Sequence, residues 1–417
     1  MNIGVIGAGV AGLTAAHLLS KKHKVTLIEK EKRIGGHTNT INVKENGVNI
    51  GIDTGFIVLN DRNYPNFKKL LNKLEVKLRN TDMSFSYYDE NDGFNYAGTG
   101  ISGYFSQKKN LFSMKHYRFL LNVKKYSKIA AKDVESNNIL EETLGEYLTR
   151  KKFPIEIIQR FIIPMGAAVW SGSRNDMMNF PARMFLQFFN NHGILDLNNA
   201  PQWHTVVGGS FTYVKKILDS FIGEIIQGNG VKKVIRENKK VTVTLEDGKT
   251  IVFDKVICAS HADQTFEIVK DLSQEEEAVL KPWSYSKNTT ILHTDSSLMP
   301  PSRSAWACWN YVKNKDSNDS DDVSVTYYMN RLQGLKTKND YLVTLNPTKE
   351  IPDEKKLYEI VYTHPKYTQS SISTQEKIKE VNGSNHLYFC GSYCRYGFHE
   401  DGVISAVDIA KELGCKL

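Results

Sequence analysis

The segment that decides the fold is "MNIGVIGAGVAGLTAAHLLSKKHKVTLIEK", residues 1–30. The apolar run near its start predicts a buried parallel strand, and the apolar spacing after Gly12 predicts a helix. A second apolar run follows and ends at Glu29. A strand, a glycine-rich turn, a helix, a second strand and an acid within about 30 residues are typical of a domain that binds a dinucleotide.

Each small residue of the turn has a physical task. Gly7 allows a sharp turn, Gly9 lets the backbone approach a pyrophosphate, and Gly12 lets the helix pack closely on the strand. The start of the helix, around Ala11, offers free N–H groups and the positive end of the helix dipole to phosphates. Glu29 can accept hydrogen bonds from ribose hydroxyls, which disfavours a ribose with a 2′-phosphate.

A second pair of glycines separates the two common dinucleotides, NAD and FAD. Residues 30–40 read "KEKRIGGHTNT", and an enzyme that binds only NAD has no need of a glycine pair directly after the ribose acid. The segment resembles the FAD-dependent amine oxidase and phytoene desaturase superfamily, which includes protoporphyrinogen oxidase. In that superfamily Gly35 and Gly36 would let the backbone pass beside the pyrophosphate and flavin, and Lys30 or Arg33 would meet the phosphates.

The resemblance extends over almost the whole chain. Residues 47–61, "GVNIGIDTGFIVLND", predict a strand and a turn that passes the flavin in the superfamily, and the backbone at 231 is expected to meet the adenine. Relatives often have an acid after the glycine of the final strand, where this chain has a serine. The FAD contacts implied beyond the first two turns are His37, Asp53, Thr54, Gly55, Phe56, Val231, Gly391, Ser392, Gly402 and Val403.

The C-terminal turn "YCRYGFHEDG", residues 393–402, concentrates polar residues before a small-residue helix. We expect that helix to begin at Gly402, with Asp401 as its N-cap. Its free N–H groups would then face the flavin and stabilise negative charge on the reduced cofactor. His399 is a candidate for proton transfer, although His399 and Glu400 could instead serve only the backbone of the turn.

The chain is expected to have an α/β fold with two domains. The first is a Rossmann-type FAD-binding domain, with a parallel sheet and an antiparallel ribbon, built from residues 1–61, 203–262 and 384–417. The second is a substrate domain of mixed antiparallel sheet and helices, built from residues 62–202 and 263–383, with its helical part at about 101–200.

Aromatic and aliphatic residues alternate in residues 83–87 and recur in the predicted strands around 306–311 and 327–329, which favours an apolar substrate slot. Amine oxidases use an aromatic cage, to which Tyr393 and Trp309 are the candidates here. They also often have a lysine that holds a water near the flavin. We find no such lysine, because the strand expected to carry it reads "AWACWNY" (305–311), and its absence disfavours amine oxidation.

The chain is also similar to a bacterial subgroup associated with cyclopropane or methyl fatty-acid synthesis, and more distantly to polyunsaturated fatty-acid isomerase. This resemblance implies hydride transfer to FAD from an apolar substrate, an unsaturated or methyl-branched acyl chain of a lipid. An amine oxidase, a double-bond isomerase and a non-catalytic FAD-stabilised binding protein at a membrane remain open. The segments that carry the resemblance are "DTGFIVLND…YP" (53–65), "TDMSFSYY" (81–88), "IPMGAAVWS" (163–171), "WHTVVGGS" (203–210) and "GFHEDG" (397–402).

Charge is unevenly distributed along the 417 residues, whose net charge is +8. Residues 108–132 contain eight Lys or Arg and no acid. On a helix, Tyr117, Leu120, Leu121 and Ile129 would form an apolar side, as in a helix at the surface of an anionic membrane. A solvated helix face over the substrate domain is the alternative. No nucleic-acid-reading motif occurs, so we expect no nucleic-acid partner.

No run of about 18 apolar residues or secretory signal is found, so we expect a cytoplasmic protein, at or near the inner membrane surface. The five cysteines have no framework spacing and are expected to be free thiols. Cys390 and Cys394 lack partners with ligand spacing, so no metal site is predicted.

Overall fold

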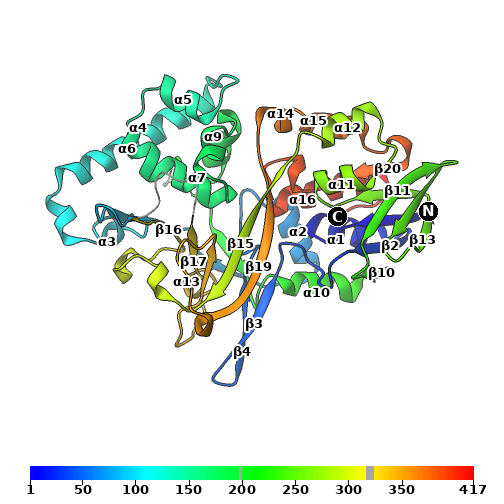
Figure 1. The fold of residues 1–417 in the computed structure, drawn as a ribbon, viewed down its shortest axis with the longest axis horizontal. Coiled ribbons are helices and arrows are strands. Elements are labelled where there is room, and N and C mark those ends of the chain that lie inside the picture. The colour runs from blue at the N-terminus through cyan, green and yellow to red at the C-terminus, as the bar shows by residue number, and fades with distance from the viewer. Residues whose placement is uncertain (197–199, 316–323) are drawn as a thin grey trace.

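The computed structural model describes residues 1–196, 200–315 and 324–417. The molecule is elongated and has two lobes (Figure 1). Both chain termini lie in one lobe, and the helices of residues 114–191 form the outer part of the other. The long strands β15 (Tyr285–His293) and β19 (Lys356–Pro365) run between the lobes. The predicted α/β fold is confirmed.

The lobe with the termini is built on a five-stranded sheet in the order β10-β2-β1-β14-β20. All four pairings are parallel, so strands from both ends and the middle of the chain meet side by side. The central strands are buried on both faces, which explains their continuous apolar sequence. The strands are β1 (Asn2–Ile6), β2 (Lys24–Glu29), β10 (Glu224–Gln227), β14 (Lys255–Cys258) and β20 (Leu387–Phe389).

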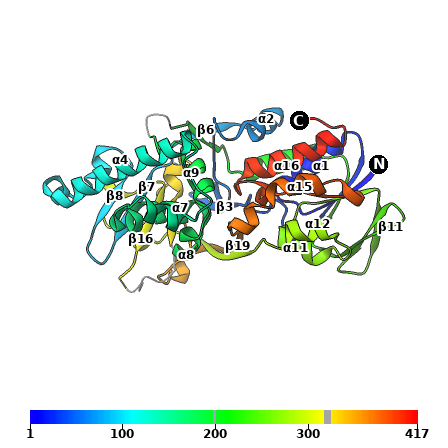
Figure 2. The same cartoon turned by 90° about the horizontal axis from the view of Figure 1, so that it is seen from above.

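Helices from the two ends of the chain pack on each other beside this sheet. Helix α1 (Val10–Leu19) lies against α16 (His399–Glu412), as Figure 2 shows from above. A Cβ added at Gly402 would lie 2.9 Å from Cγ1 of Val10, and one added at Gly12 would clash with the carbonyl oxygen of Gly7. Close helix packing therefore requires glycine at both positions.

The start of α16 differs from the sequence prediction. The helix begins at His399, with Phe398 as its N-cap, so the predicted start at Gly402 is wrong. Asp401 is not the N-cap but a residue of the first turn, where its carboxylate accepts a hydrogen bond of 2.9 Å from the backbone N–H of Phe398. Asp401 therefore accepts a hydrogen bond from the cap residue instead of being the cap residue. As a result His399, Glu400 and Asp401 belong to the first turn of the helix.

The predicted antiparallel ribbon is present as β11 (Val231–Glu237), β12 (Lys240–Leu245) and β13 (Thr250–Phe253). Helices α11 (Ala262–Ile268), α12 (Gln274–Leu280) and α15 (Gln375–Val381) lie in the same lobe (Figure 1). Helix α2 (Pro65–Lys73) joins them, because Glu400 of α16 accepts hydrogen bonds from the backbone N–H groups of Asn66 and Phe67. This lobe therefore includes segments that the sequence analysis placed in the substrate domain.

The second lobe has a seven-stranded sheet in the order β19-β15-β18-β17-β16-β7-β8. Its pairings are antiparallel except between β16 and β7. Trp306 precedes the strand in which it was expected, because its indole N–H donates to the carbonyl of Pro300 at 2.8 Å. The strands not yet given are β7 (Phe85–Asp89), β8 (Asn95–Ala97), β16 (Trp309–Lys313), β17 (Val325–Tyr328) and β18 (Leu342–Leu345).

Helices cover one end of this sheet, and two small sheets connect the lobes. Ser113 caps α4, where its hydroxyl accepts a hydrogen bond from the N–H of His116. The helices are α3 (Ile101–Tyr104), α4 (Met114–Glu135), α5 (Leu144–Arg150), α6 (Ile155–Ile157), α7 (Ile163–Trp170), α8 (Arg174–Met178) and α9 (Ala182–Asn191). Helix α13 (Met329–Leu332) lies next to β17, and α14 (Gln369–Ile372) lies beside α15 of the first lobe (Figure 1). The connecting elements are β3 (Thr40–Glu45), β4 (Val48–Asp53), β5 (Val58–Asn60), β6 (Leu78–Thr81), β9 (Trp203–Val206) and α10 (Phe211–Ser220).

A buried ion pair fixes the ribbon to α12. The guanidinium of Arg236 donates to both carboxylate oxygens of Glu276, at 2.7 and 2.9 Å. Because Glu276 is buried, we expect Glu276→Gln to lower the free energy of unfolding by about 3 kcal/mol. The matched control is Glu277→Gln, because the exposed carboxylate of Glu277 pairs with Lys281. This substitution should change the free energy of unfolding by less than about 0.5 kcal/mol. Urea denaturation measures both, and equal effects would contradict the prediction.

Candidate functional site

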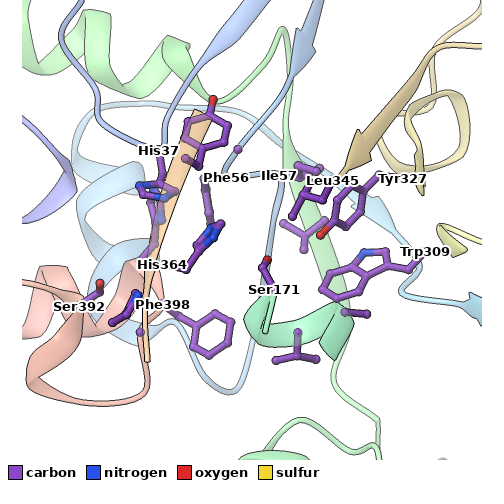
Figure 3. A pocket seen from close by; sticks show the side chains of 18 of the residues that line it. His37, Phe56, Ile57, Ser171, Trp309, Tyr327, Leu345, His364, Ser392 and Phe398 are labelled. Atoms are coloured by element: carbon purple, nitrogen blue, oxygen red, sulfur yellow. The ribbon is translucent and has the colours of Figure 1, made fainter. Parts of the chain in front are cut away.

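A cavity of about 2010 Å³ is lined by residues of both lobes. Figure 3 shows His37, His364 and Ser392 on one side, and Trp309, Tyr327 and Leu345 on the other. The residues of the first two glycine-rich turns line the same cavity as those of the seven-stranded sheet. The nucleotide site and the substrate slot expected from the sequence are therefore parts of one space.

The two glycine-rich turns meet backbone to backbone at the cavity. A Cβ at Gly36 would lie 3.0 Å from Cα of Gly9, whereas a Cβ at Gly9 would have no atom within 4 Å. Gly9 is also the N-cap of α1. The bare backbone and the unobstructed space at the start of a helix form a cradle for a pyrophosphate. Arg33 braces the second turn, because its guanidinium donates to the carbonyl of Gly36 at 2.7 Å.

Glu29 closes the nucleotide part of the cavity. Its two carboxylate oxygens accept hydrogen bonds from the backbone N–H groups of Ala8, at 2.7 Å, and Glu31, at 3.0 Å. The side chain is buried against protein yet lines the cavity. An oriented carboxylate beside a bare phosphate cradle fits the ribose of a dinucleotide, so these residues are suited to hold the adenosine diphosphate of FAD.

Most of the residues expected at the site line the cavity. They are Gly7, Gly9, Ala11, Glu29, Lys30, Arg33, Gly36, His37, Thr54, Gly55, Phe56, Val231, Gly391 and Ser392, together with Trp309, Tyr393 and His399. Five others are absent from the lining: Gly12, Gly35, Asp53, Gly402 and Val403. Gly12 and Gly402 serve helix packing, and the buried Val403 packs in the core of the first lobe.

Asp53 has a structural role away from the cavity. Its carboxylate accepts hydrogen bonds from the backbone N–H and the hydroxyl of Ser210, both at 2.8 Å, and from the amide of Gln333 at 3.1 Å. Burial raises the pKa of Asp53 to about 6. The acid thus joins β4 to the start of α10 and to the second lobe. A carboxylate occupied in this way does not explain a flavin contact, which the neighbouring Thr54, Gly55 and Phe56 remain placed to make.

His399 and Glu400 have separate roles. The ring of His399 stacks on Phe56 with centroids 3.6 Å apart, and its Nε2 lies 3.0 Å from the hydroxyl of Thr38. Burial, helped by His37, holds the pKa of His399 well below its ordinary value, so the ring is neutral. Glu400 instead fixes the start of α2 through its hydrogen bonds to Asn66 and Phe67, which is a structural role.

A group of histidines on the cavity wall was not recognised in the sequence beyond His37. The ring centroid of His37 lies 5.0 Å from that of His364 and 6.5 Å from that of His261. Burial lowers the pKa of His37 and His364 to about 3 and that of His261 to about 4. The side-chain amide of Asn288 donates to Nδ1 of His364 at 2.9 Å, since a neutral ring with its proton on Nε2 accepts there.

The aromatic candidates are contributed by different lobes. Trp309 of β16 packs edge-on against Tyr327, with centroids 5.3 Å apart, and Tyr393 packs against Trp283 at 5.5 Å. The indole N–H of Trp309 and the hydroxyl of Tyr393 are buried without a hydrogen-bond partner among the described residues. Unsatisfied buried donors facing a cavity suit a site that a bound molecule completes.

The cavity wall also contains a lysine that the sequence analysis did not single out. Lys287 of β15 lines the cavity, opposite Thr363 in the register of β15 and β19. The sequence analysis looked for a lysine only in the segment 305–311, whereas Lys287 belongs to the preceding strand of the sheet, β15. The signal that could have found it is the alternation in "YSKNTTILH" (285–293), which places Tyr285 and Lys287 on the same face.

A family model described as "Flavin containing amine oxidoreductase" matches residues 10–302. An L-amino-acid oxidase of Siganus canaliculatus is 24% identical over 314 residues, which cover 70% of this chain and 56% of that protein. An L-amino-acid oxidase of Mus musculus is 36% identical over 106 residues, 25% of this chain and 16% of that protein. The chain thus spans about half the length of the first relative and less of the second.

Solved structures share the fold over nearly the whole chain. Putrescine oxidase bound to putrescine is similar with a TM-score of 0.69 and 12% identity, covering 99% of both chains. A CLA-producing fatty acid isomerase from P. acnes has a TM-score of 0.68 and 15% identity, covering 98% of both. A putative protoporphyrinogen oxidase from Exiguobacterium has a TM-score of 0.67 and 15% identity, covering 99% of this chain and 98% of that one.

The cradle at Gly9 yields a direct test. The residue has an extended backbone with φ −76°, and a Cβ there meets no atom, so Gly9→Val should fold and melt as the cofactor-free parent does. The added side chain fills the space of the pyrophosphate, and we expect FAD to bind about a hundredfold more weakly. Gly12→Val is the control that should fail to fold. Titration with FAD measures the affinity, and thermal melts of the cofactor-free proteins measure folding. If Gly9→Val bound FAD as tightly as the parent, the pyrophosphate would not lie at Gly9.

The neutral histidines predict a pH dependence. An unfolded histidine takes up a proton near pH 6.5, whereas burial keeps His364 neutral in the folded protein down to about 3. The unfolded chain therefore binds more protons below about pH 6.5, and folded stability falls on acidification. We expect the melting temperature of cofactor-free His364→Asn to fall less between about pH 7 and 5 than that of the parent. Equal slopes would show that His364 is not held neutral.

Proposed function

The chain belongs to the flavin-containing amine oxidoreductases and is an FAD-dependent oxidoreductase, and on this premise we propose that it acts on a long apolar substrate. The substrate class we assign is the unsaturated or methyl-branched acyl chain of a lipid. The observation that carries the assignment is the apolar wall of the cavity, which continues from the histidines into the helices of the second lobe.

Side chains from strands, helices and connecting segments make this wall. The sheet contributes Trp309 and Leu345, whereas α4 contributes Leu120 and Val123 at the other side. A slot that extends from strands to an outer helix suits a chain-like molecule better than a compact one. The further apolar residues of the wall are Met83, Phe85, Phe119, Phe161, Met165, Val169, Phe188, Ile194, Leu195 and Tyr327.

The charges on this side of the cavity argue against a cationic substrate. Asp82 is paired with Arg331 at 2.8 Å and also accepts a hydrogen bond from Ser84. The cations Lys124 and Lys128 and the single acid Asp196 also line this wall, and all three are exposed. A protonated amine would therefore meet lysines and an already neutralised carboxylate, whereas an acyl chain needs no charge partner.

When bound, FAD supplies the redox chemistry by accepting a hydride, that is, one proton and an electron pair, from a substrate carbon. The chain supplies a dry apolar slot that orients the carbon and excludes water. The neutral ring of His37 can accept the proton that leaves the neighbouring carbon when a double bond forms, because its Nε2 is buried without a hydrogen-bond partner among the described residues, whereas Nδ1 of His364 already accepts from Asn288. Dioxygen or an electron carrier would be the final acceptor of the electron pair.

Two other reactions fit the same framework. Amine oxidation is favoured by Lys287 on the cavity wall and by the names of the L-amino-acid oxidases that the chain resembles. Double-bond isomerisation would return the hydride to a different carbon, and the fold shared with a fatty acid isomerase supports it. The residues that line the cavity favour an acyl substrate over an amine. Analysis of the products would distinguish dehydrogenation of the acyl chain from isomerisation of its double bond.

The test is anaerobic reduction of the bound flavin by a defined panel in detergent micelles: oleate, methyl-branched stearate, oleoyl phosphatidylglycerol, putrescine and L-phenylalanine. We expect loss of the oxidised flavin absorbance with an acyl compound and none with the amines. Comparison of flavin reduction by oleate and by oleoyl phosphatidylglycerol shows whether the enzyme uses the free acid or the phospholipid. Reduction by amines alone, slowed in Lys287→Met, would overturn the proposal in favour of amine oxidation.

The same assay tests the slot itself. Val123→Trp fills the cavity at α4, so we expect the KM for a long-chain compound to rise about tenfold or more while kcat and the KM for a short-chain analogue stay unchanged. Lys132→Trp is the matched control, because Lys132 lies on the same helix but is exposed and does not line the cavity. An equal response of long and short chains to Val123→Trp would show that the acyl chain does not reach α4.

A further inference from the structure

Large apolar side chains are exposed together at the tip of the second lobe. Phe112, Met114 and Ile101 are 90%, 82% and 80% exposed, and Leu121 is 66% exposed. Leu111 and Tyr117 are exposed beside them. Residues this apolar and this exposed rarely cluster on a soluble protein unless something covers them.

The same tip is strongly basic. Residues 93–132 contain no acid, and the exposed cations Lys108, Lys109 and Arg118 stand among the apolar side chains. We call the six apolar residues together with Lys108, Lys109, Lys115, Arg118, Lys124 and Lys125 the docking patch. Of these six cations only Lys115 makes an ion pair within residues 1–196, 200–315 and 324–417, with Asp92 and Glu156 at 3.8 and 3.9 Å.

Contacts within the protein hold the docking patch in a defined shape. The hydroxyl of Tyr117 donates to the carbonyl of Leu111 at 3.0 Å, and Phe105 packs against Tyr117 with centroids 5.6 Å apart. These contacts fix the turn that carries Phe112 to the first turns of α4. The patch lies at the end of the molecule away from the two termini: Figure 1 shows this for α3 and α4, and Figure 2 shows it again for α4.

Helix α4 connects the docking patch to the cavity. Met114, Tyr117 and Leu121 are spaced three and four residues apart, so they form one exposed stripe. The stripe continues to Lys124 and Lys128, which line the cavity. Leu120 and Val123, which directly precede Leu121 and Lys124 in the sequence, line it as well. The cavity therefore reaches the surface beside the docking patch.

From this geometry we infer that the docking patch binds the surface of an anionic phospholipid membrane and presents the end of the cavity to it. Apolar side chains enter the boundary between headgroups and acyl chains, while the lysines and Arg118 meet the phosphates. An acidic protein surface would pair with the cations but would leave Phe112 and Met114 uncovered. Entry of a lipid substrate from the bilayer rests on the proposed function; the docking itself rests only on the patch.

The experiment is co-sedimentation of the full-length FAD-bound protein with vesicles of phosphatidylcholine, with and without phosphatidylglycerol. We expect binding that needs the anionic lipid and weakens with salt. Phe112→Ser with Met114→Ser should lower binding at least about tenfold, and Lys108→Gln, Lys109→Gln and Arg118→Gln together by about a hundredfold, at roughly fivefold per cation. Val48→Ser with Ile222→Ser, at similarly exposed apolar sites of 62% and 71%, is the control and should bind as the parent.

The outcomes separate this inference from the proposed function. Loss of vesicle binding in both patch variants, with flavin reduction by micellar acyl lipid unchanged, supports docking. Vesicle binding without any reduction by acyl compounds supports docking and refutes the proposed substrate. No vesicle binding by the parent, or equal binding by the patch variants, overturns the inference. A parental dimer that the patch variants convert to monomer would likewise overturn it, because a second copy would then cover the patch.

Discussion

Two glycine-rich turns from the first 36 residues touch through their backbones, with a Cβ at Gly36 only 3.0 Å from Cα of Gly9. The same absence of side chains lets Gly12 sit against the carbonyl of Gly7 and lets Gly402 receive Val10. A larger residue at Gly12 or Gly402 would push α1 away from its turn or from α16, and a larger residue at Gly36 would push the second turn away from Gly9. The nucleotide cradle, the sheet and the closing helix therefore all depend on close backbone packing that only glycine permits.

The sequence specifies this lobe because its signals are local. A turn, a helix and an acid within a short segment can be recognised without knowing the rest of the fold, and the structure brings Gly9, Glu29 and Arg33 to the cavity as expected. The start of α16 could not be predicted in the same way. Asp401 can act as an N-cap or, from the first turn, accept a hydrogen bond from the cap residue, and spacing alone does not distinguish the two. Its neighbour Glu400 is held by α2, more than 300 residues away in sequence.

The second lobe is harder to predict because its wall is assembled from distant segments. Lys287 and His364 lie on neighbouring strands separated by more than seventy residues, and no local pattern relates them. Asp53 shows the opposite error: its position beside Gly55 suggests the cofactor, but its carboxylate is turned toward Ser210 and Gln333. Sequence spacing places a residue in a turn, whereas the direction of its side chain is decided by partners that only the folded chain supplies.

Polarity changes along the cavity in a way that matches two different ligands. The nucleotide part offers backbone N–H groups, Glu29 and Arg33, which suit phosphates and ribose. At the centre the histidines are neutral, so they add hydrogen-bonding capacity without a charge that would draw in water. Beyond them most of the wall is apolar as far as α4, where Lys124 and Lys128 also line the cavity. Direct transfer of an acyl chain from a membrane into the slot would avoid the cost of exposing the chain to water on the way. The helix that ends the slot is also the one that carries exposed apolar residues and cations on its outer face.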